Sequence, residues 1–358
     1  MSTNQLYNTW YKEMSELRPS EHTSRLRSFV WLLVGLFLAQ TVHLSKIGMK
    51  IPGSATHKSK ERRVQRIVDN PAIRVRRWYA PWITAILEQI VAHGLPVRLI
   101  VDGSKVGFGH QLLMVAVAYR RRAIPVAWTW VKGSRGHSSS WKQLALLSYV
   151  RGLIPAGATV SLVGDSEFGA IPVLKWLDKA GWQYVLRQKG NHLVRLPNQT
   201  QWQRFDGLIS RHRQCVWIPQ ALLTENHAYG VNLLAYWGSG EKEPWLLATN
   251  YPEVRAALRA YRKRMWIEEM FGDFKGHGFD LESTHLHHFL RLARLTLAVA
   301  LLYLWLVAYG SKVIKDGRRY LVDRKDRCDL SIFRIGLDMI ERHFTNQEAF
   351  VFRWLPYF

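Results

Sequence analysis

The order of strand and helix patterns between residues 97 and 187 constrains the fold of this chain more than any other feature. Three short runs rich in apolar and β-branched residues cover residues 97–102, 112–119 and 124–131, with brief polar separators. A helix-length segment follows at 138–151, then a strand at 159–165, a helix at 168–180 and a strand at 183–187. The pattern predicts a three-stranded antiparallel meander followed by helix, strand, helix and strand.

This order is that of an RNase H-like core. We therefore predict an α/β fold whose core is a mixed five-stranded sheet with flanking helices. Residues 190–248 carry short strand patterns separated by Gly, Asn and Pro turns, which indicates a β-rich insertion into this core. Residues 1–95 show helix-length apolar patterns and few strand signals, so they predict an N-terminal helical domain.

The charge of the chain indicates a polyanionic partner. Lys and Arg number 50 against 27 Asp and Glu, a net charge of +23, which favours nucleic acid through counterion release. A basic protein without a nucleic-acid partner is the alternative. The basic stretch at 58–66 suits a DNA-binding edge of the helical domain, and a solvated helix face explains it equally well.

Cysteine usage and the apolar runs limit the class of protein further. Two cysteines exclude a disulfide framework and a cysteine-based zinc site, which fits a reducing compartment, and residues 1–17 lack a signal-peptide pattern. The apolar runs at 29–39 and 295–310 are too short to span a membrane, and polar residues interrupt them. We expect both runs to be buried helices and expect no membrane partner.

We expect five parts along the chain. They are an N-terminal helical domain expected to bind DNA at 1–95, the first part of the catalytic core at 96–189, the β-rich insertion at 190–249, the second part of the core at 250–310, and a basic C-terminal tail at 311–358.

Three carboxylates are candidates for chemistry. Asp102 and Asp165 end the first and fourth predicted strands, which are neighbours in an RNase H-like sheet, and Glu268 lies on a helix predicted over 252–275. Clustered carboxylates cannot all stay ionised without cations, and oxygen ligands favour Mg²⁺ or Mn²⁺ over zinc. Two such ions about 3.5–4 Å apart would activate a water or a 3′-hydroxyl and stabilise the leaving oxygen of a phosphodiester.

Each acid has a competitor or a plainer explanation. Asp102 before Gly103 also suits a turn residue. Glu167 competes with Asp165, and Glu269 competes with Glu268.

A helical stripe settles the choice between Glu268 and Glu269. Tyr261, Arg264, Glu268 and Lys275 stand at offsets of 0, 3, 7 and 14. On one helix they fall at roughly 0°, −60°, −20° and −40°, whereas Glu269 lies about 100° from Glu268. The carboxylate can hold a divalent cation, and the other three side chains can bind phosphate oxygens.

The spacing Y-x2-R-x3-E-x6-K, read from Tyr261 to Lys275, resembles the signature of bacterial DDE transposases of the insertion sequence 4 family. The segments Val101-Asp-Gly-Ser104 and Val163-Gly-Asp-Ser-Glu-Phe168 resemble the other two acidic motifs of that family. A β-rich insertion between the second Asp and the Glu is also a family trait.

The resemblance implies a cut-and-paste transposase that hydrolyses and joins phosphodiester bonds at the ends of an insertion sequence. Asp102, Asp165 and Glu268 would hold two Mg²⁺ ions, for which Mn²⁺ can substitute. Tyr261, Arg264 and Lys275 would contact the DNA backbone.

The resemblance also implies the partners and the setting. The partners would be double-stranded DNA, as element ends and as target, and further copies of the chain in a dimer or larger assembly on DNA. The setting would be the bacterial cytoplasm, in association with the nucleoid. In relatives a tryptophan of the insertion helps to hold a flipped base, and Trp237 and Trp245 are candidates that the sequence does not distinguish.

Two other functions stay open. One is a catalytically inactive, transposon-derived DNA-binding protein, which the presence of all three acids disfavours. The other is an RNase H-like nuclease that cleaves DNA without joining it.

Overall fold

The computed structural model describes residues 2–107, 109–133, 138–349, 351–352 and 354–358. Its contacts divide the chain into two compact units. The sheet unit comprises Gly94–Lys105 and Gln111–Glu268, and the helical unit comprises Met1–His93, Val106–His110 and Glu269–Phe358.

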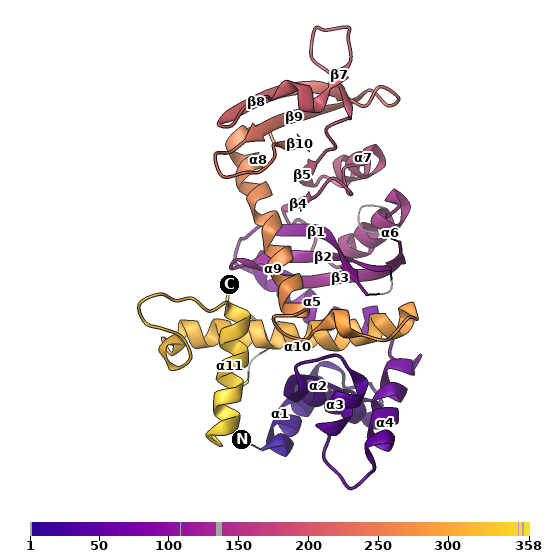
Figure 1. The fold of residues 1–358 in the computed structure, drawn as a ribbon, viewed down its shortest axis with the longest axis vertical. Coiled ribbons are helices and arrows are strands. Elements are labelled where there is room, and N and C mark those ends of the chain that lie inside the picture. Colours follow the sequence, from indigo (N-terminus) through magenta and orange to yellow (C-terminus); the bar gives the residue numbers. More distant parts are fainter. Residues whose placement is uncertain (1, 108, 134–137, 350, 353) are drawn as a thin grey trace. The chain divides into compact units, whose positions relative to one another are not determined.

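A ten-stranded mixed sheet forms the centre of the sheet unit (Figure 1). Its spatial order is β3-β2-β1-β4-β5-β10-β9-β8-β6-β7. The strands are β1 Val97–Val106, β2 His110–Tyr119, β3 Arg122–Lys132, β4 Val160–Gly164, β5 Gln183–Arg187, β6 Leu193–Arg195, β7 Gln203–Arg204, β8 Gln214–Leu223, β9 Tyr229–Trp237 and β10 Trp245–Thr249.

The first five strands have the order predicted for an RNase H-like core, with β4 parallel to both β1 and β5. Arg120 and Arg121 join β2 to β3 with φ of 41° and 64°, the backbone of a tight hairpin turn, so these two strands run antiparallel. All five residues of β4 are buried, which requires cover on both faces of the sheet.

The sheet is larger than the five strands predicted. The insertion continues the core sheet, because β10 pairs antiparallel with β5 and β9 pairs antiparallel with β10. The alternation of apolar and polar residues predicts each strand but not which distant strand it pairs with, so the pairing of β10 with β5 could not be predicted.

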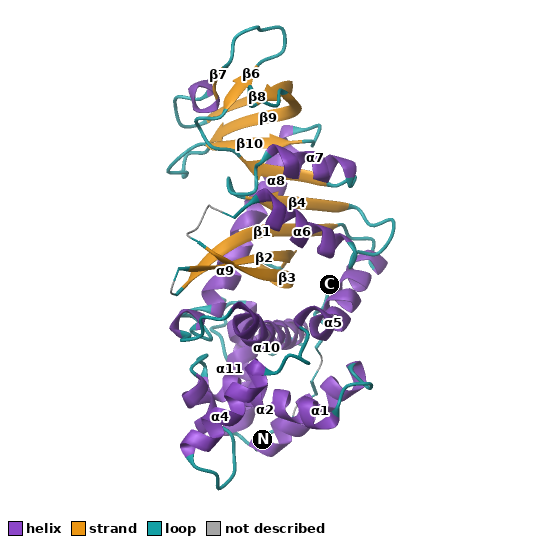
Figure 2. Ribbon diagram, turned by 90° about the vertical axis from the view of Figure 1, so that its right-hand side faces the viewer, coloured by secondary structure: helices purple, strands orange, loops and turns teal. Residues whose placement is uncertain are grey.

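Helices cover both faces of the core strands. The helix α6 (Ser140–Arg151) packs against β3 and against α7 (Ile171–Lys179), which also contacts β5. The helix α8 (Val254–Tyr261) packs on β4 and β5 from the opposite face (Figure 2).

The single helix predicted over 252–275 is wrong. After α8 the chain forms a 3-10 turn, η2 (Arg262–Arg264), and then α9 (Met265–Phe274). A 3-10 turn rotates each residue by about 120° rather than 100°, so three residues shift the phase of the predicted stripe by about 60°. The other 3-10 turns are η1 Phe205–Leu208, η3 Leu281–Ser283 and η4 Arg319–Leu321.

The helical unit is built around one long apolar helix, α10 (Phe289–Lys315). Alone among the described helices, it is long and apolar enough to cross a membrane, yet 94% of its most apolar window is buried. Its neighbours within the unit include α2, α4, α5 and α11, so α10 is the buried core helix that the sequence predicts. The remaining helices are α1 Thr3–Leu17, α2 Thr23–Ala39, α3 Leu44–Met49, α4 His57–Asp69, α5 Val75–Ala92 and α11 Ile332–Thr345.

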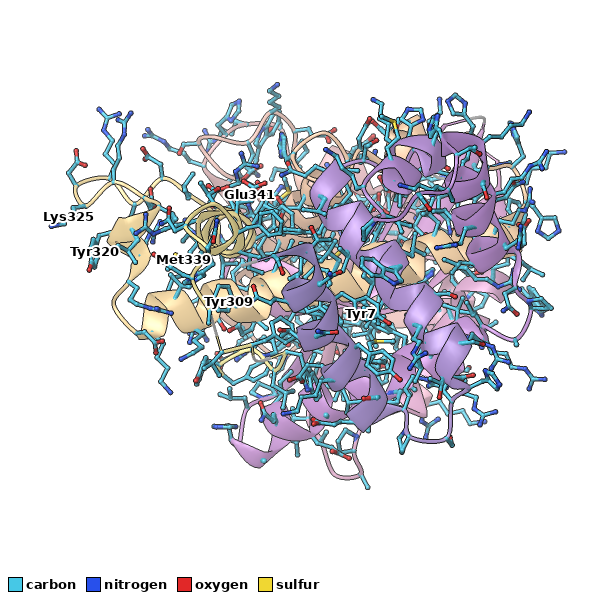
Figure 3. The ribbon with its side chains drawn as sticks, turned by 90° about the horizontal axis from the view of Figure 1, so that it is seen from below. Tyr7, Tyr309, Tyr320, Lys325, Met339 and Glu341 are labelled. Carbon is cyan, nitrogen blue, oxygen red and sulfur yellow. The ribbon has the colours of Figure 1, made fainter. Side chains whose placement is uncertain are left out.

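The helix α11 is fixed to α10 and α2 by buried and half-buried polar contacts. The hydroxyl of Tyr309 in α10 forms a 2.8 Å hydrogen bond with Nε2 of His343. At the end of α2, Gln40 donates to the carboxylate of Glu341. Figure 3 labels Tyr309 on α10 together with Met339 and Glu341 on α11.

Candidate active site

Asp102 lies within β1 and is 1% exposed. The strand continues to Val106, so the prediction that it ends at this acid is wrong. The backbone N–H of Gly103 donates to Asp102 Oδ1 at 2.7 Å. A Cβ at Gly103 would lie 2.1 Å from Nε2 of Gln111, so a larger residue beside the acid would displace that side chain.

Asp165 follows directly after β4, as predicted. Val101 of β1 pairs with Gly164 of β4, so Asp102 and Asp165 are the next residues along two paired parallel strands. The backbone N–H of Glu167 donates to Asp165 Oδ1 at 2.9 Å, which fixes the carboxylate at this turn.

Glu167, the competitor of Asp165, is engaged in a local network. Its carboxylate accepts a hydrogen bond from Gln111 Nε2 at 2.9 Å and one from the backbone N–H of Ser138 at 2.9 Å. Gln143 Nε2 donates to the backbone carbonyl of Glu167 at 2.9 Å. Glu167 therefore anchors the start of α6 to the turn after β4.

Arg264 joins two of the three predicted ligands. Its Nη1 lies 3.3 Å from Asp102 Oδ2, and its Nη2 lies 2.8 Å from Oε1 of Glu268 in the first turn of α9. The Arg264 side chain is 13% exposed and that of Glu268 is 36% exposed. Burial opposes the charge of Arg264, but Tyr261, Asp102 and Glu268 outweigh it and raise the pKa of the guanidinium.

The carboxylates do not form a preassembled metal cluster. Across the described parts of the chain, no three His, Cys, Asp or Glu side chains are grouped closely enough to hold a metal ion. Asp102, Asp165 and Glu268 nevertheless all belong to the sheet unit and offer only oxygen donors, which suit Mg²⁺ and Mn²⁺. In this structure the guanidinium of Arg264 balances the charge of Asp102 and Glu268.

Tyr261 ends α8 with its hydroxyl buried. The residue is 3% exposed, and its hydroxyl has no hydrogen-bond partner among the residues that the structure describes. Burial raises the pKa of Tyr261 to about 12, so the phenol keeps its proton and can donate it to an acceptor. The ring packs edge-on against Trp245, with centroids 5.0 Å apart.

A cavity of about 360 Å³ lies beside Tyr261 and is lined mainly by basic and aromatic side chains. Sequence reasoning missed one of these, Arg187 at the end of β5, whose guanidinium pairs with Glu243 at 2.9 Å. Its position at the carboxyl end of the strand beside β4 is the signal that could have found it. The basic and aromatic lining residues are Arg187, Lys242, Trp245, Tyr261, Arg262 and Arg264.

The two candidate tryptophans of the insertion have different surroundings. Trp245 lines this cavity. Trp237 instead packs against the ring of His212, at 4.5 Å between centroids, and donates its indole N–H to the carbonyl of Glu241 at 3.0 Å.

Lys275 belongs to a different unit from the other members of the predicted stripe. It follows α9, belongs to the helical unit, and its Nζ lies 2.6 Å from Glu282 Oε1. Because η2 breaks the helix, Lys275 does not share one helix with Tyr261 and Arg264. Glu269 is exposed and also falls in the helical unit, whereas Glu268 falls in the sheet unit.

Known proteins resemble the chain in the region that carries these residues. A family model described as "Transposase DDE domain" matches residues 96–305, more than half of the chain. One similar solved structure is described as "Cryo-EM structure of piggyBac transposase synaptic complex with hairpin DNA". It has 12% sequence identity and a TM-score of 0.43, covering 99% of this chain and 83% of that chain. No curated protein matches the chain.

Proposed function

The chain belongs to the family of transposase DDE domains, and we propose that it mobilises an element of the insertion sequence 4 family by a cut-and-paste reaction. It is a DNA transposase, an enzyme that cleaves DNA strands and transfers them.

The observation that carries the proposal is the pair of contacts made by Arg264. A carboxylate as buried as Asp102 needs a positive partner, because an isolated charge in the protein interior is strongly disfavoured. The same guanidinium contacts Glu268, 166 positions further along the chain and within the family match. Asp165 follows the strand paired with that of Asp102, so three acids from separate elements belong to one side of the core.

Asp102, Asp165 and Glu268 would hold Mg²⁺, with Mn²⁺ as a substitute, in a two-ion site. When bound, the ions supply Lewis-acid activation of a water or 3′-hydroxyl and stabilise the leaving oxygen. The protein's own part is to fix the carboxylates: Gly103 and Glu167 orient Asp102 and Asp165 through backbone N–H groups.

Tyr261, Arg264 and Lys275 would contact the backbone of the transferred DNA end, and we add Arg187. The Tyr261 hydroxyl lacks an acceptor in the described structure, and a phosphate oxygen would provide one. Arginine binds phosphate in a bidentate manner, so Arg187 and Arg264, which line the same cavity, suit adjacent backbone contacts. Trp245 lines that cavity as well, which favours it over Trp237 as the residue that holds a flipped base.

The wider setting is proposed on the family resemblance and the charge. The chain would act as a homodimer or larger assembly on double-stranded element ends and target DNA, in the bacterial cytoplasm at the nucleoid. The net charge of +23 supports contact with DNA over a large surface.

A strand-transfer assay tests the proposal. Fragments carrying the inverted repeats that flank the gene are incubated with a plasmid, Mg²⁺ and either the protein or its Asp165→Asn variant. We expect joined product with the unaltered protein and at least a hundredfold less, on the order expected for loss of a metal ligand, with the variant. Nicked but never joined product would support a nuclease, and binding without any cleavage would support an inactive DNA-binding protein.

A further inference from the structure

A second basic site lies within the helical unit, outside the residues considered above. It is a cavity of about 550 Å³ between the first turns of α2, the second half of α4 and the segment after α4. Four arginines line it, and none of the described residues lining it is acidic. The polar and charged members, which we call the arginine pocket, are His22, Ser24, Arg25, Arg27, Ser28, Arg63, Arg66 and Asn70.

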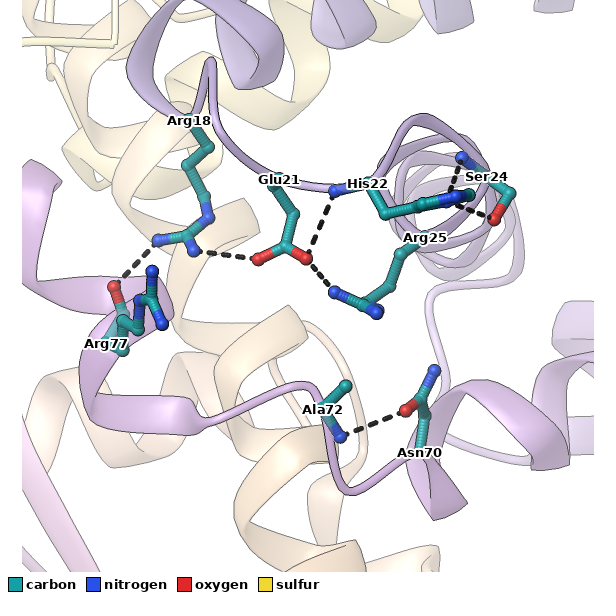
Figure 4. Close-up of polar contacts among 8 residues, drawn as sticks. All are labelled: Arg18, Glu21, His22, Ser24, Arg25, Asn70, Ala72 and Arg77. Carbon is teal, nitrogen blue, oxygen red and sulfur yellow. Dashed lines mark hydrogen bonds and ion pairs between the residues drawn. The ribbon is translucent and has the colours of Figure 1, made fainter.

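One wall of the arginine pocket is fixed by ion pairs. Glu21 binds Arg25, and its other oxygen accepts from Arg18 Nη2 at 2.9 Å (Figure 4). Arg18 Nη1 in turn donates to the backbone carbonyl of Arg77 at 2.7 Å, which ties the start of α2 to α5. Burial opposes ionisation of Glu21, but its bonds to Arg18, His22 and Arg25 outweigh burial and lower the pKa of this carboxyl.

The other three arginines have uncompensated charge. Arg27, Arg63 and Arg66 are exposed and make no hydrogen bond or ion pair with any residue that the structure describes. Arg63 and Arg66 are three residues apart on α4, so their side chains emerge on neighbouring positions of one helix face. The positive end of α2 adds to the field, because its N-cap residue His22 and Ser24 of its first turn line the same cavity.

The chemistry of the pocket selects a phosphate polyanion. Guanidinium groups bind phosphate oxygens through paired N–H donors, and the three uncompensated guanidinium groups exceed what one monovalent anion neutralises. Because three of the lining arginines are exposed, a ligand can extend beyond the cavity. Trp31 also lines the cavity, and its ring stacks on that of Tyr7 with centroids 4.3 Å apart.

We propose that the arginine pocket binds successive backbone phosphates of duplex DNA at a place distinct from the catalytic carboxylates. This inference rests on the proposed function, since it assumes that DNA is the partner. Contacts of this kind position a duplex without reading its sequence. The pocket would therefore fix the duplex on the helical unit while Tyr261, Arg187 and Arg264 bind the strand that reacts.

A matched pair of double variants in the helical unit tests the inference. Arg63→Gln with Arg66→Gln removes two charges inside the pocket, and Lys46→Gln with Lys50→Gln removes two exposed charges at α3, outside it. Binding to a duplex of roughly 30 base pairs is followed by fluorescence anisotropy in EDTA over a range of salt. Thermal unfolding of each variant shows that the fold is kept.

We expect the pocket variant to bind the duplex at least tenfold more weakly, with a log–log salt slope reduced by about two. The control variant should lose less than about threefold in affinity. Equal losses in the two variants, or an unchanged pocket variant, would overturn the inference. The inference would also be overturned if the pocket binds inorganic phosphate or a mononucleotide but substitution of Arg63 and Arg66 does not change duplex binding.

The assay separates this inference from the proposed function. If the pocket variant binds DNA normally and the unaltered protein transfers strands, only the pocket assignment fails. If the unaltered protein binds duplex through Arg63 and Arg66 but never cleaves it with Mg²⁺, the proposed function fails and the pocket stands.

Discussion

At the scale of the residue, Arg264 is the internal counter-ion of Asp102 and Glu268. We expect Arg264→Gln to lower the free energy of unfolding by about 2–4 kcal/mol in EDTA, because it leaves a buried carboxylate unpaired. Mg²⁺ should restore part of the lost free energy of unfolding, because a bound cation then neutralises the carboxylates that Arg264 no longer pairs with. Thermal unfolding with and without Mg²⁺ measures both effects.

The neighbouring and exposed Arg262 provides the control for this prediction. Arg262→Gln should unfold at nearly the temperature of the unaltered protein, with no larger response to Mg²⁺. If Arg264→Gln behaves like Arg262→Gln, the guanidinium does not compensate Asp102.

Tyr261 gives a prediction in which stability and activity separate. Its hydroxyl is buried without a partner in the described structure, so Tyr261→Phe should leave the free energy of unfolding unchanged or raise it by up to about 1 kcal/mol. Strand transfer should fall roughly tenfold, as expected for one lost hydrogen bond to a charged phosphate. A variant that is destabilised by more than about 1 kcal/mol would show that the hydroxyl has a structural role instead.

Some of the candidate site follows from the sequence and some does not. The four-residue spacing from Arg264 to Glu268 predicts their contact, because such residues are neighbours on a helix. The contact from Arg264 to Asp102 crosses 162 positions and needs the folded sheet. The bonds of Glu167 to Gln111 and Ser138 distinguish it from Asp165 as a candidate ligand, and no local sequence pattern specifies these bonds.

At the scale of the element, periodicity predicts α8 and α9 but not the 3-10 turn between them. The apolar pattern is continuous across Arg262–Arg264, three basic residues with no breaker among them, so a single helix is the natural prediction. The order of β1 to β5 is predictable because each element has its own pattern and short connections. The pairing of β10 with β5 is not predictable in this way, because the two strands are about 60 residues apart in the chain.

The crossing of α10 and α11 depends on two glycines. A Cβ on Gly336 would lie 1.9 Å from the carbonyl oxygen of Leu306, and one on Gly310 would lie 2.0 Å from that of Ile332. We expect Gly336→Ala to lower the free energy of unfolding by about 1–3 kcal/mol, because the helix backbones must move apart. Chemical denaturation measures the change.

Gly276→Ala is the matched control, because a Cβ there meets nothing within 4 Å. Its free energy of unfolding should change by less than about 0.5 kcal/mol. Similar values for the two variants would mean that α10 and α11 do not approach as closely as the structure has them.

At the scale of the whole molecule, the sequence indicates a DNA-binding enzyme more readily than it indicates which segments fold together. Charge and the order of acidic motifs are visible in the chain itself. Residues 1–93 and 269–358 form one unit because α10 packs against α2, α4, α5 and α11. That grouping joins the two ends of the chain through apolar surfaces. Because the hydrophobic effect is not directional, the sequence does not show which apolar helices pack together.

The central claim is that Asp102, Asp165 and Glu268 hold the metal that drives strand transfer. Asp165→Cys tests it most directly, because a thiolate is a softer ligand than a carboxylate and accepts Mn²⁺ far better than Mg²⁺. We predict that this variant joins DNA at background level in Mg²⁺ and regains at least about tenfold in Mn²⁺, while Asp165→Asn stays inactive in both. Equal activity of Asp165→Cys in the two metals, or full activity of Asp165→Asn, would contradict the account.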